Sequence, residues 1–296
     1  AIKKQYEDQI AQLQKKLDIS PTTNPNQTVA ELWQNCGLET FLLLEGIFAL
    51  AIWDKQKREL WIGRDRAGGR TLYYTVKDST IWIAPRLKNL SPYHSKELDL
   101  IALRDYLSCA FVPGERTLWQ GVKELRPGKF IHFTDKFETH PQLTYWQPQT
   151  QVKNANKPIE YHSQKLRLLL DKIIPEYLPK NQPVGAYLSG GLDSSCITAL
   201  IAKNHNHPVH TYSIHFGEKL PNELEFSNLV AQHCQTQHHI LEITTDDMWN
   251  NLPITIANLD DPIGDPLTVP NYLLGKLAAE KVEVINACGF LKKMYI

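Results

Sequence analysis

The sequence lacks an excess of charge of either sign. Its 296 residues include 32 Lys and Arg and 32 Asp and Glu, so the formal net charge at pH 7 is zero. Proteins that bind nucleic acid or an acidic membrane surface usually carry a basic excess, and we expect neither partner. The sequence also lacks an apolar run long enough to cross a membrane and a visible signal peptide. These absences lead us to expect a cytoplasmic protein.

Cysteine is scarce, and no two cysteines stand at CxxC spacing. The five residues are Cys36, Cys109, Cys196, Cys234 and Cys288. Such scattered positions predict neither a zinc site nor a disulfide framework, and they favour reduced thiols. The eleven histidines are also scattered, apart from His238 and His239. That pair opens a predicted strand, where one member is readily explained as a core residue.

The length of the chain indicates two domains rather than one. Hydrophobic residues make up 42% of the sequence, which is enough for packed cores. Residues 149–158 are polar and form the predicted linker. We therefore expect a first domain over residues 1–150 and a second over residues 158–296.

Hydrophobic periodicity predicts the elements of the first domain. Apolar residues at helical spacing predict an amphipathic helix over 3–17 and a second helix through Val29, Leu32 and Trp33, with a polar turn at 20–28 between them. Alternating or apolar runs around a polar turn predict a β-hairpin from 48–53 and 59–64. Further strands are expected at 71–76, 81–84 and 129–133. Arg64, Asp65 and Arg66 are interpreted as a structural ion-pair corner.

Residues 184–202 are the most informative stretch of the chain. An apolar run over 184–188 predicts a buried strand, Ser189, Gly190 and Gly191 predict a turn, and 192–202 predicts a helix. Adjacent glycines allow a ligand to approach the backbone, and a helix N-terminus favours an anion. The nearby Asp193 requires a cation beside that anion. The pattern therefore predicts Mg-bound polyphosphate, and the alternative is a glycine-rich turn capped by serines.

In the second domain, predicted strands alternate with predicted helices. The strands fall at 209–216, 238–243 and 282–285, and the helices at 223–235 and 268–280. This order implies a parallel sheet with helices on both faces and a ligand site beyond the carboxyl ends of the strands. After the linker, one more helix is expected to place Leu166, Leu169, Leu170, Ile173 and Tyr177 on one side. Asp265 is interpreted as a helix N-cap rather than a catalytic residue.

Several motifs in one order carry a family resemblance. The Ser-Gly-Gly-x-Asp-Ser spacing of 189–194 resembles the pyrophosphate loop of ATP pyrophosphatases, which split ATP between its α and β phosphates. Residues 44–54, 64–68 and 72–74 are similar to the glutaminase half of asparagine synthetase. Residues 112–119, 125–128 and 145–146 are similar to the segment that leads to the synthetase half. The chain thus resembles the glutamine-dependent asparagine synthetases and their relatives, the β-lactam synthetases and lasso-peptide cyclases.

The resemblance implies a fold class of α/β and α+β. The first domain would be a partial glutaminase-like αββα domain of the N-terminal-nucleophile type, and the second an incomplete Rossmann-like ATP pyrophosphatase domain with a parallel sheet. It implies ATP and Mg as cofactors, adenylation of a carboxylate such as aspartate, and displacement of AMP by an amine or ammonia. A homodimer or a partner chain stays open. The nucleotide-binding residues implied are Leu188, Ser189, Gly190, Gly191, Asp193, Ser194, Ser195 and Ile214, with Asp193 also at the metal. No catalytic residue is assigned, and Leu188 and Ile214 are equally explained as core aliphatics.

The departures from the family pattern qualify this expectation. The family uses an N-terminal cysteine to hydrolyse glutamine, whereas this chain starts at Ala1 and its first cysteine is Cys36. The family's Ser-Asp-Thr-Glu motif falls near 24–27, which carries no charge. After Gly289 the family's acidic motif is not continued. We therefore expect a family member truncated at both ends, an inactive glutaminase half and a marginally stable second half. The alternatives are a non-catalytic nucleotide-binding fragment and a related ligase.

Overall fold

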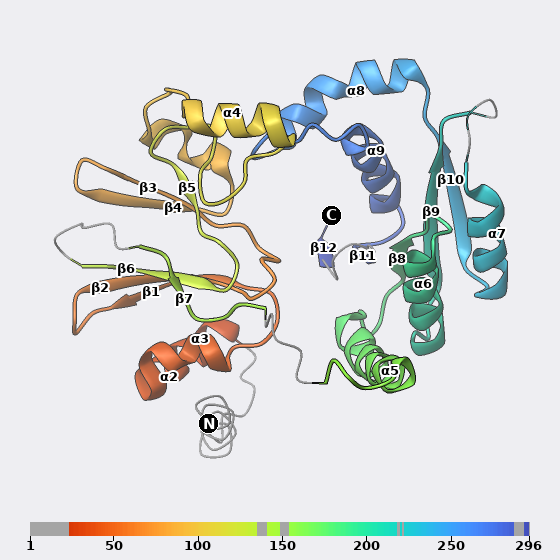
Figure 1. Ribbon diagram of the computed structural model, residues 1–296, viewed down its shortest axis with the longest axis horizontal. Coiled ribbons are helices and arrows are strands. Elements are labelled where there is room, and N and C mark those ends of the chain that lie inside the picture. Colours follow the sequence, from red (N-terminus) through yellow and green to blue (C-terminus); the bar gives the residue numbers. More distant parts are fainter. Residues whose placement is uncertain are drawn as a thin grey trace. The chain divides into compact units, whose positions relative to one another are not determined.

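The computed structural model describes residues 24–134, 141–148, 154–217, 220 and 222–286, together with the backbone of one further strand, β12 (Lys293–Tyr295). The chain divides into two compact units, Ala1–Thr150 and Gln151–Ile296, and each is described by itself (Figure 1). The helix expected over 3–17 and the side chains of the tail after residue 286 lie outside the described residues.

The first unit is built from short helices and antiparallel strands. In chain order its elements are α2 (Pro25–Cys36), η1 (Gly37–Glu39), α3 (Thr40–Leu43), β1 (Ala49–Asp54), β2 (Glu59–Arg64), β3 (Tyr73–Lys77), β4 (Thr80–Ala84), η2 (Leu87–Tyr93), α4 (Leu100–Cys109), β5 (Lys123–Glu124), β6 (Lys129–Phe133) and β7 (Leu143–Thr144). The predicted hairpin is confirmed, because β1 pairs antiparallel with β2. The three further predicted strands are confirmed as β3, β4 and β6.

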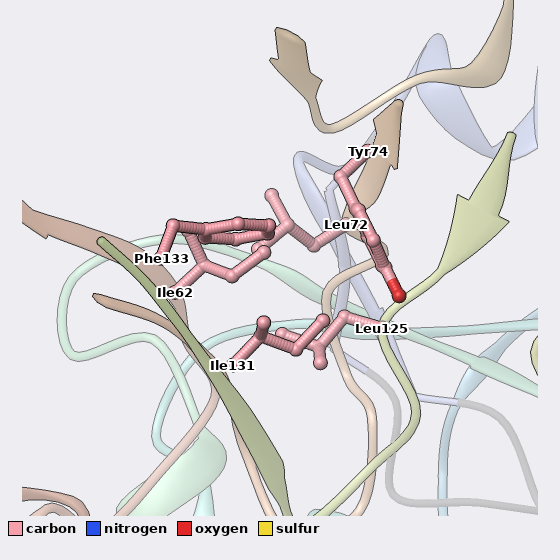
Figure 2. Close-up of a cluster of buried hydrophobic side chains, with 6 residues drawn as sticks. All are labelled: Ile62, Leu72, Tyr74, Leu125, Ile131 and Phe133. Carbon is pink, nitrogen blue, oxygen red and sulfur yellow. The ribbon is translucent and has the colours of Figure 1, made fainter. Parts of the chain in front are cut away.

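Two antiparallel sheets face each other in this unit. The strand orders are β1-β2-β6-β7 and β4-β3-β5. A buried cluster joins β2, β3 and β6 across the space between the sheets (Figure 2); its members are Ile62, Leu72, Tyr74, Leu125, Ile131 and Phe133. This cluster is the core of the first unit.

Helical segments cover both outer faces of the paired sheets. Trp33 of α2 packs on Trp61 of β2 with ring centroids 5.7 Å apart, and Phe41 of α3 stacks on Phe130 of β6 at 5.1 Å. On the other sheet, Leu87 of η2 joins the buried cluster that contains residues of β3 and β4. The result is the four-layered αββα arrangement expected from the sequence.

The turn predicted over 20–28 is wrong from residue 25 onward, because α2 begins at Pro25. The Asn24 side chain accepts a hydrogen bond from the backbone N–H of Asn26 at 3.0 Å and acts as the N-cap. Pro25 occupies the first helical position, where its missing N–H removes no helical bond. A Pro/Asn-rich stretch therefore serves here as a helix start rather than as a turn.

Residues 64–66 form a structural corner, as predicted, but the ion pair joins Arg64 to Glu124 and not to Asp65. Arg64 lies buried and contacts Glu124 at 2.6 Å. The Asp65 carboxylate accepts the backbone N–H groups of Ala67 and Gly69, each at 3.0 Å. Asp65 thus holds the turn after β2, while Arg64 ties that strand to β5.

The second unit alternates helices with strands. In chain order its elements are α5 (Ile159–Tyr177), β8 (Val184–Tyr187), α6 (Leu192–Asn204), β9 (Val209–His215), α7 (Leu224–His233), β10 (Gln237–Glu242), α8 (Thr245–Asn258), α9 (Thr268–Ala279), β11 (Val284–Asn286) and β12. The strand order is β10-β9-β8-β11-β12. The first four strands run parallel, and β12 pairs antiparallel with β11 at the edge.

Helices cover both faces of this sheet. On one face, Ile174 of α5 and Ile201 of α6 pack against Val184 and Ala186 of β8. On the other face, residues of α9 pack against Tyr212 of β9. The expectation of a parallel sheet with helices on both faces is confirmed.

The apolar side predicted for α5 is confirmed at Leu170, Ile173 and Tyr177, which are partly buried, and is wrong at Leu166 and Leu169. Leu166 and Leu169 are 57% and 52% exposed, whereas Ile174 is 2% exposed. The helix carries Leu at three consecutive positions, 168–170, and Ile at two, so the sequence allows more than one apolar stripe at helical spacing. Contact with α6 and β8 selects the stripe that contains Ile174.

Three histidines of β9 and β10 make the second unit sensitive to acid. Burial is the main cause that lowers the pKa of His210, His238 and His239 below 6.5. The unfolded chain then binds protons more readily than the folded chain, so stability is full above pH ~6.5 and falls as the pH drops toward the folded pKa values. We expect urea unfolding of this unit to need less denaturant at about pH 5.5 than at about pH 7.5. A midpoint that does not change between these conditions would contradict the assignment, and His210→Gln should reduce the difference.

Candidate functional site

The loop singled out by the sequence lies at the carboxyl end of an interior strand. β8 stands between β9 and β11 and ends at Tyr187. Leu188 to Gly191 form the connection, and α6 begins at Leu192. The predicted strand, turn and helix are therefore confirmed, with α6 extending two residues further than expected.

Only glycine fits at position 190. Its φ of +89° lies in the region that side chains disfavour. A Cβ atom there would meet Glu223 O, Phe226 Cβ and Ser227 N, each at 2.9 Å. The loop is thus pressed against the start of α7. Gly191, by contrast, has an ordinary φ of −67° and is the N-cap of α6.

The serines brace the loop from within. The Ser189 and Ser194 hydroxyls lie 3.0 Å apart. The hydroxyls of Ser194 and Ser195 both donate to the Gly191 carbonyl, at 3.1 and 2.7 Å. Ser194 is only 5% exposed, whereas Ser189 is exposed. Internal hydrogen bonds therefore fix the shape of the loop, and Ser189 is the most exposed of its three serines.

The start of α6 carries no side-chain cap. Gly191 at the N-cap has no side chain to accept the N–H groups of the first turn. A helix N-terminus in this state carries a partial positive charge and favours an anion. The parallel strand β8 is followed by a glycine turn and then by α6. This order places the first N–H groups of α6 beyond the carboxyl end of the sheet.

Asp193 is exposed in the first turn of α6. No ion pair or hydrogen bond joins its carboxylate to another residue in the described part of the chain, so it is available to a cation. Within the same described residues, no group of three or more His, Cys, Asp or Glu side chains could hold a metal ion. A divalent cation at Asp193 would therefore need most of its ligands from a bound anion and from water.

Leu188 and Ile214 are held differently from the loop glycines and serines. Leu188 is 1% exposed, and its N–H donates to the Tyr212 carbonyl at 2.9 Å. Ile214 lies on the neighbouring strand β9 and packs against the cluster on the α9 face. The structure thus brings residues 188–195 together and leaves Ile214 one strand away, with part of its side chain buried in the core.

Asn286 is a candidate that the sequence reasoning missed. It ends β11, lies beside Ala186 of β8 and is 5% exposed. Its Nδ2 atom has no hydrogen-bond partner among the described residues. A polar residue that closes an apolar strand at the carboxyl edge of a parallel sheet was the signal available in the sequence.

The residues considered for glutamine chemistry, Cys36 and residues 24–27, lie in or at the start of α2. Cys36 ends α2 and is partly buried, and burial, followed by the charge of Glu39, raises the pKa of its thiol. A raised pKa keeps the thiol protonated and weakly nucleophilic. Asn24 caps α2, and Gln27 donates to Glu31 at 2.9 Å on the same helix.

Across the described residues, no helix has both the length and the apolar character needed to span a membrane.

Comparison with known proteins gives matches over both units. Residues 165–285 match the asparagine synthase family, and residues 5–146 match the glutamine amidotransferase domain family. Over 248 residues the chain is 31% identical to asparagine synthetase (glutamine-hydrolyzing) 1 of Bacillus subtilis strain 168, an alignment that covers 81% of this chain and 38% of that protein. It is 28% identical over 276 residues to a putative asparagine synthetase (glutamine-hydrolyzing) of Mycobacterium bovis, with 90% and 42% covered.

A third relative also matches over most of this chain. The putative asparagine synthetase (glutamine-hydrolyzing) 2 of Methanocaldococcus jannaschii is 26% identical over 285 residues, with 93% of this chain and 54% of that protein covered. The chain therefore spans about half the length, or less, of the curated relatives that it matches. With both family matches, and with relatives of this name aligned over 81–93% of its length, the chain belongs to the asparagine synthetase family.

Proposed function

We propose that the second unit binds Mg-ATP at residues 188–195 and serves an ATP-dependent ligase that forms an amide. The observation that carries the proposal is the uncapped start of α6, which follows a turn that only glycine can form. Its first turn bears the exposed Asp193, which has no ion-pair or hydrogen-bond partner among the described residues. Nothing in the fold of a serine-capped structural turn requires that carboxylate. The same residues are the ones whose sequence pattern resembles a pyrophosphate loop.

In the proposed reaction, a carboxylate oxygen attacks the α-phosphorus of ATP and pyrophosphate leaves with Mg²⁺. Ammonia then attacks the acyl carbon of the adenylate, and the amide forms as AMP leaves and a proton is released. The first-turn N–H groups of α6 would hold the leaving pyrophosphate, Ser189 would add a hydroxyl, and Asp193 would hold the cation. Such a site acts by positioning and by neutralising charge on the leaving group. The names of the relatives make aspartate the proposed carboxylate, and ammonia is the proposed nitrogen donor.

In the proposal, each unit corresponds to one domain. Residues 1–150 form the glutaminase-like domain and residues 158–296 the ATP pyrophosphatase domain. The β-lactam synthetase and lasso-peptide cyclase types of ligase differ in their acceptor. An assay of AMP and pyrophosphate with different carboxylates would therefore identify the acceptor independently of the nucleotide site.

The test of the nucleotide site is Asp193→Asn. Loss of a charged contact to the cation should weaken Mg-ATP binding roughly ten- to hundred-fold in a calorimetric titration. Binding of ATP in the presence of a chelator should change much less, because the variant keeps the N–H groups of α6. Asp246→Asn is the matched control, since Asp246 is another exposed carboxylate in the first turn of a helix of the same unit. Equal Mg-ATP affinities for wild type and Asp193→Asn would reject this role for Asp193.

A further inference from the structure

A chain of polar side chains runs through the sheet to the start of the loop. The Thr236 and Thr211 hydroxyls lie 2.8 Å apart, and Thr211 Oγ1 lies 2.9 Å from His238 Nδ1. On the other side of the imidazole, Nε2 lies 3.4 Å from Ser213 Oγ. The Ser213 hydroxyl donates a short hydrogen bond to the Leu188 carbonyl. This series of hydrogen bonds thus ends on the carbonyl of Leu188, the residue that precedes Ser189.

The hydrogen bonds between these side chains can all be donated in the same direction, from Thr236 toward Leu188. Ser213 has a single hydroxyl proton and gives it to the Leu188 carbonyl, so it can only accept from His238 Nε2–H. In a neutral imidazole, Nδ1 is then an acceptor and receives the Thr211 proton. Thr211 in turn accepts from Thr236. Each group donates once toward Leu188, an arrangement in which neighbouring hydrogen bonds polarise one another.

The neutral form of His238 is favoured by its surroundings. Burial is the largest cause that lowers its pKa, His239 lowers it further, and a hydrogen bond with the Thr211 backbone opposes the change in part. Ser213 and Thr211 are 5% and 0% exposed, so neither can exchange these partners for bulk water. The lowered pKa favours a neutral imidazole, which is the form that the deduced direction requires.

The Leu188 backbone is bonded to β9 through both its N–H and its carbonyl, which belong to two successive peptide groups. Its N–H donates to the Tyr212 carbonyl at 2.9 Å, and its carbonyl accepts from Ser213. Gly190, two residues on, is confined by α7. The orientation of the Ser189 N–H, the first of the loop, follows from the orientation of the Leu188 carbonyl because both belong to one planar peptide.

We propose that His238 is a positioning residue for the nucleotide loop: acting through Ser213, it fixes the Leu188 carbonyl and so the peptide that opens residues 188–195. The inference rests on the proposed function of that loop as a nucleotide site. Among the described residues, no hydrogen bond or ion pair joins His238 to residues 189–195, so its effect is transmitted by Ser213. A merely structural histidine would support the sheet without setting the affinity of the loop.

A matched pair of variants separates these two roles. The amide nitrogen of glutamine reaches the position of imidazole Nε2, whereas that of asparagine reaches only the position of Nδ1. His238→Gln therefore keeps a donor for Ser213, and His238→Asn loses it while removing a similar amount of packing. We expect His238→Asn to bind Mg-ATP about ten-fold more weakly than wild type, the factor for loss of about one hydrogen bond, and His238→Gln to stay within about two-fold. Equal affinities for the two variants would overturn the proposal.

Nuclear magnetic resonance of the 296-residue chain tests the network without a nucleotide. At about pH 7 the imidazole nitrogen shifts of His238 should show the neutral tautomer with its proton on Nε2. The Leu188 carbonyl and Ser189 amide resonances should move in His238→Asn and remain near wild type in His238→Gln. An Nδ1–H tautomer, or unmoved resonances in His238→Asn, would overturn the positioning role. A wild-type chain that shows the expected resonances but binds no Mg-ATP would instead reject the proposed function.

Discussion

Replacing Gly190 by alanine is expected to destabilise the second unit by roughly 2–5 kcal/mol and to remove measurable Mg-ATP binding. Two effects add. The backbone φ of +89° is strained for any residue with a Cβ atom. That Cβ would also lie 2.9 Å from Glu223 O, Phe226 Cβ and Ser227 N. Two of these three atoms belong to the backbone at the start of α7, so they cannot move away as the end of a flexible side chain would.

Gly191→Ala is the matched control for this prediction. Gly191 has a φ of −67°, which alanine adopts readily, and its added Cβ would meet Ser189 Oγ at 3.3 Å. We expect its free energy of unfolding to stay within about 1 kcal/mol of wild type. Urea unfolding of the two variants, followed by calorimetric titration with Mg-ATP, makes the comparison. If Gly190→Ala unfolded at the same urea concentration as Gly191→Ala, the close contact of the loop with α7 would be refuted.

The strand, turn and helix around the loop could be predicted because their signals are local. The apolar run at 184–188, the adjacent glycines and the helical pattern that follows lie within about twenty residues. By contrast, α8 was not predicted, although Thr244 and Asp247 form a capping box at its start. That signal was present, but the helix lacks a continuous apolar stripe and exposes Trp249 and Ile256.

The parts of the site that could not be predicted depend on which strands pair. His238 and Ser213 meet only because β10 lies beside β9 in a register that pairs His238 with Thr211. Asn286 reaches the same edge because β11 pairs with β8. No spacing along the chain encodes these neighbours, since parallel strands are joined by crossovers whose length does not fix the register. The sequence therefore predicted the contiguous loop and missed the residues that the sheet brings to it.

Arg64 shows the same limit in the first unit, since its partner Glu124 is distant in sequence. We expect Arg64→Met to lower the free energy of unfolding of this unit by about 3–5 kcal/mol, because two buried carbonyls lose their donor and Glu124 loses one of its two cationic partners. Arg64 donates to Glu124 at 2.6 Å, to the Leu125 carbonyl at 2.7 Å and to the Gly68 carbonyl at 3.0 Å. Methionine fills part of the volume but offers none of these three donors.

The exposed ion pair between Arg116 and Asp99 supplies the control for Arg64. These side chains lie 2.9 Å apart, and the Arg116 side chain is 47% exposed, against 5% for Arg64. Water replaces the lost partner at an exposed site, so Arg116→Met should change stability by less than about 1 kcal/mol. Glu124 retains Arg126 at 2.7 Å, and the loss in Arg64→Met therefore falls mainly on the two carbonyls. Equal urea midpoints for the two variants would show that the Arg64 corner does not hold β2 to β5 and the following turn.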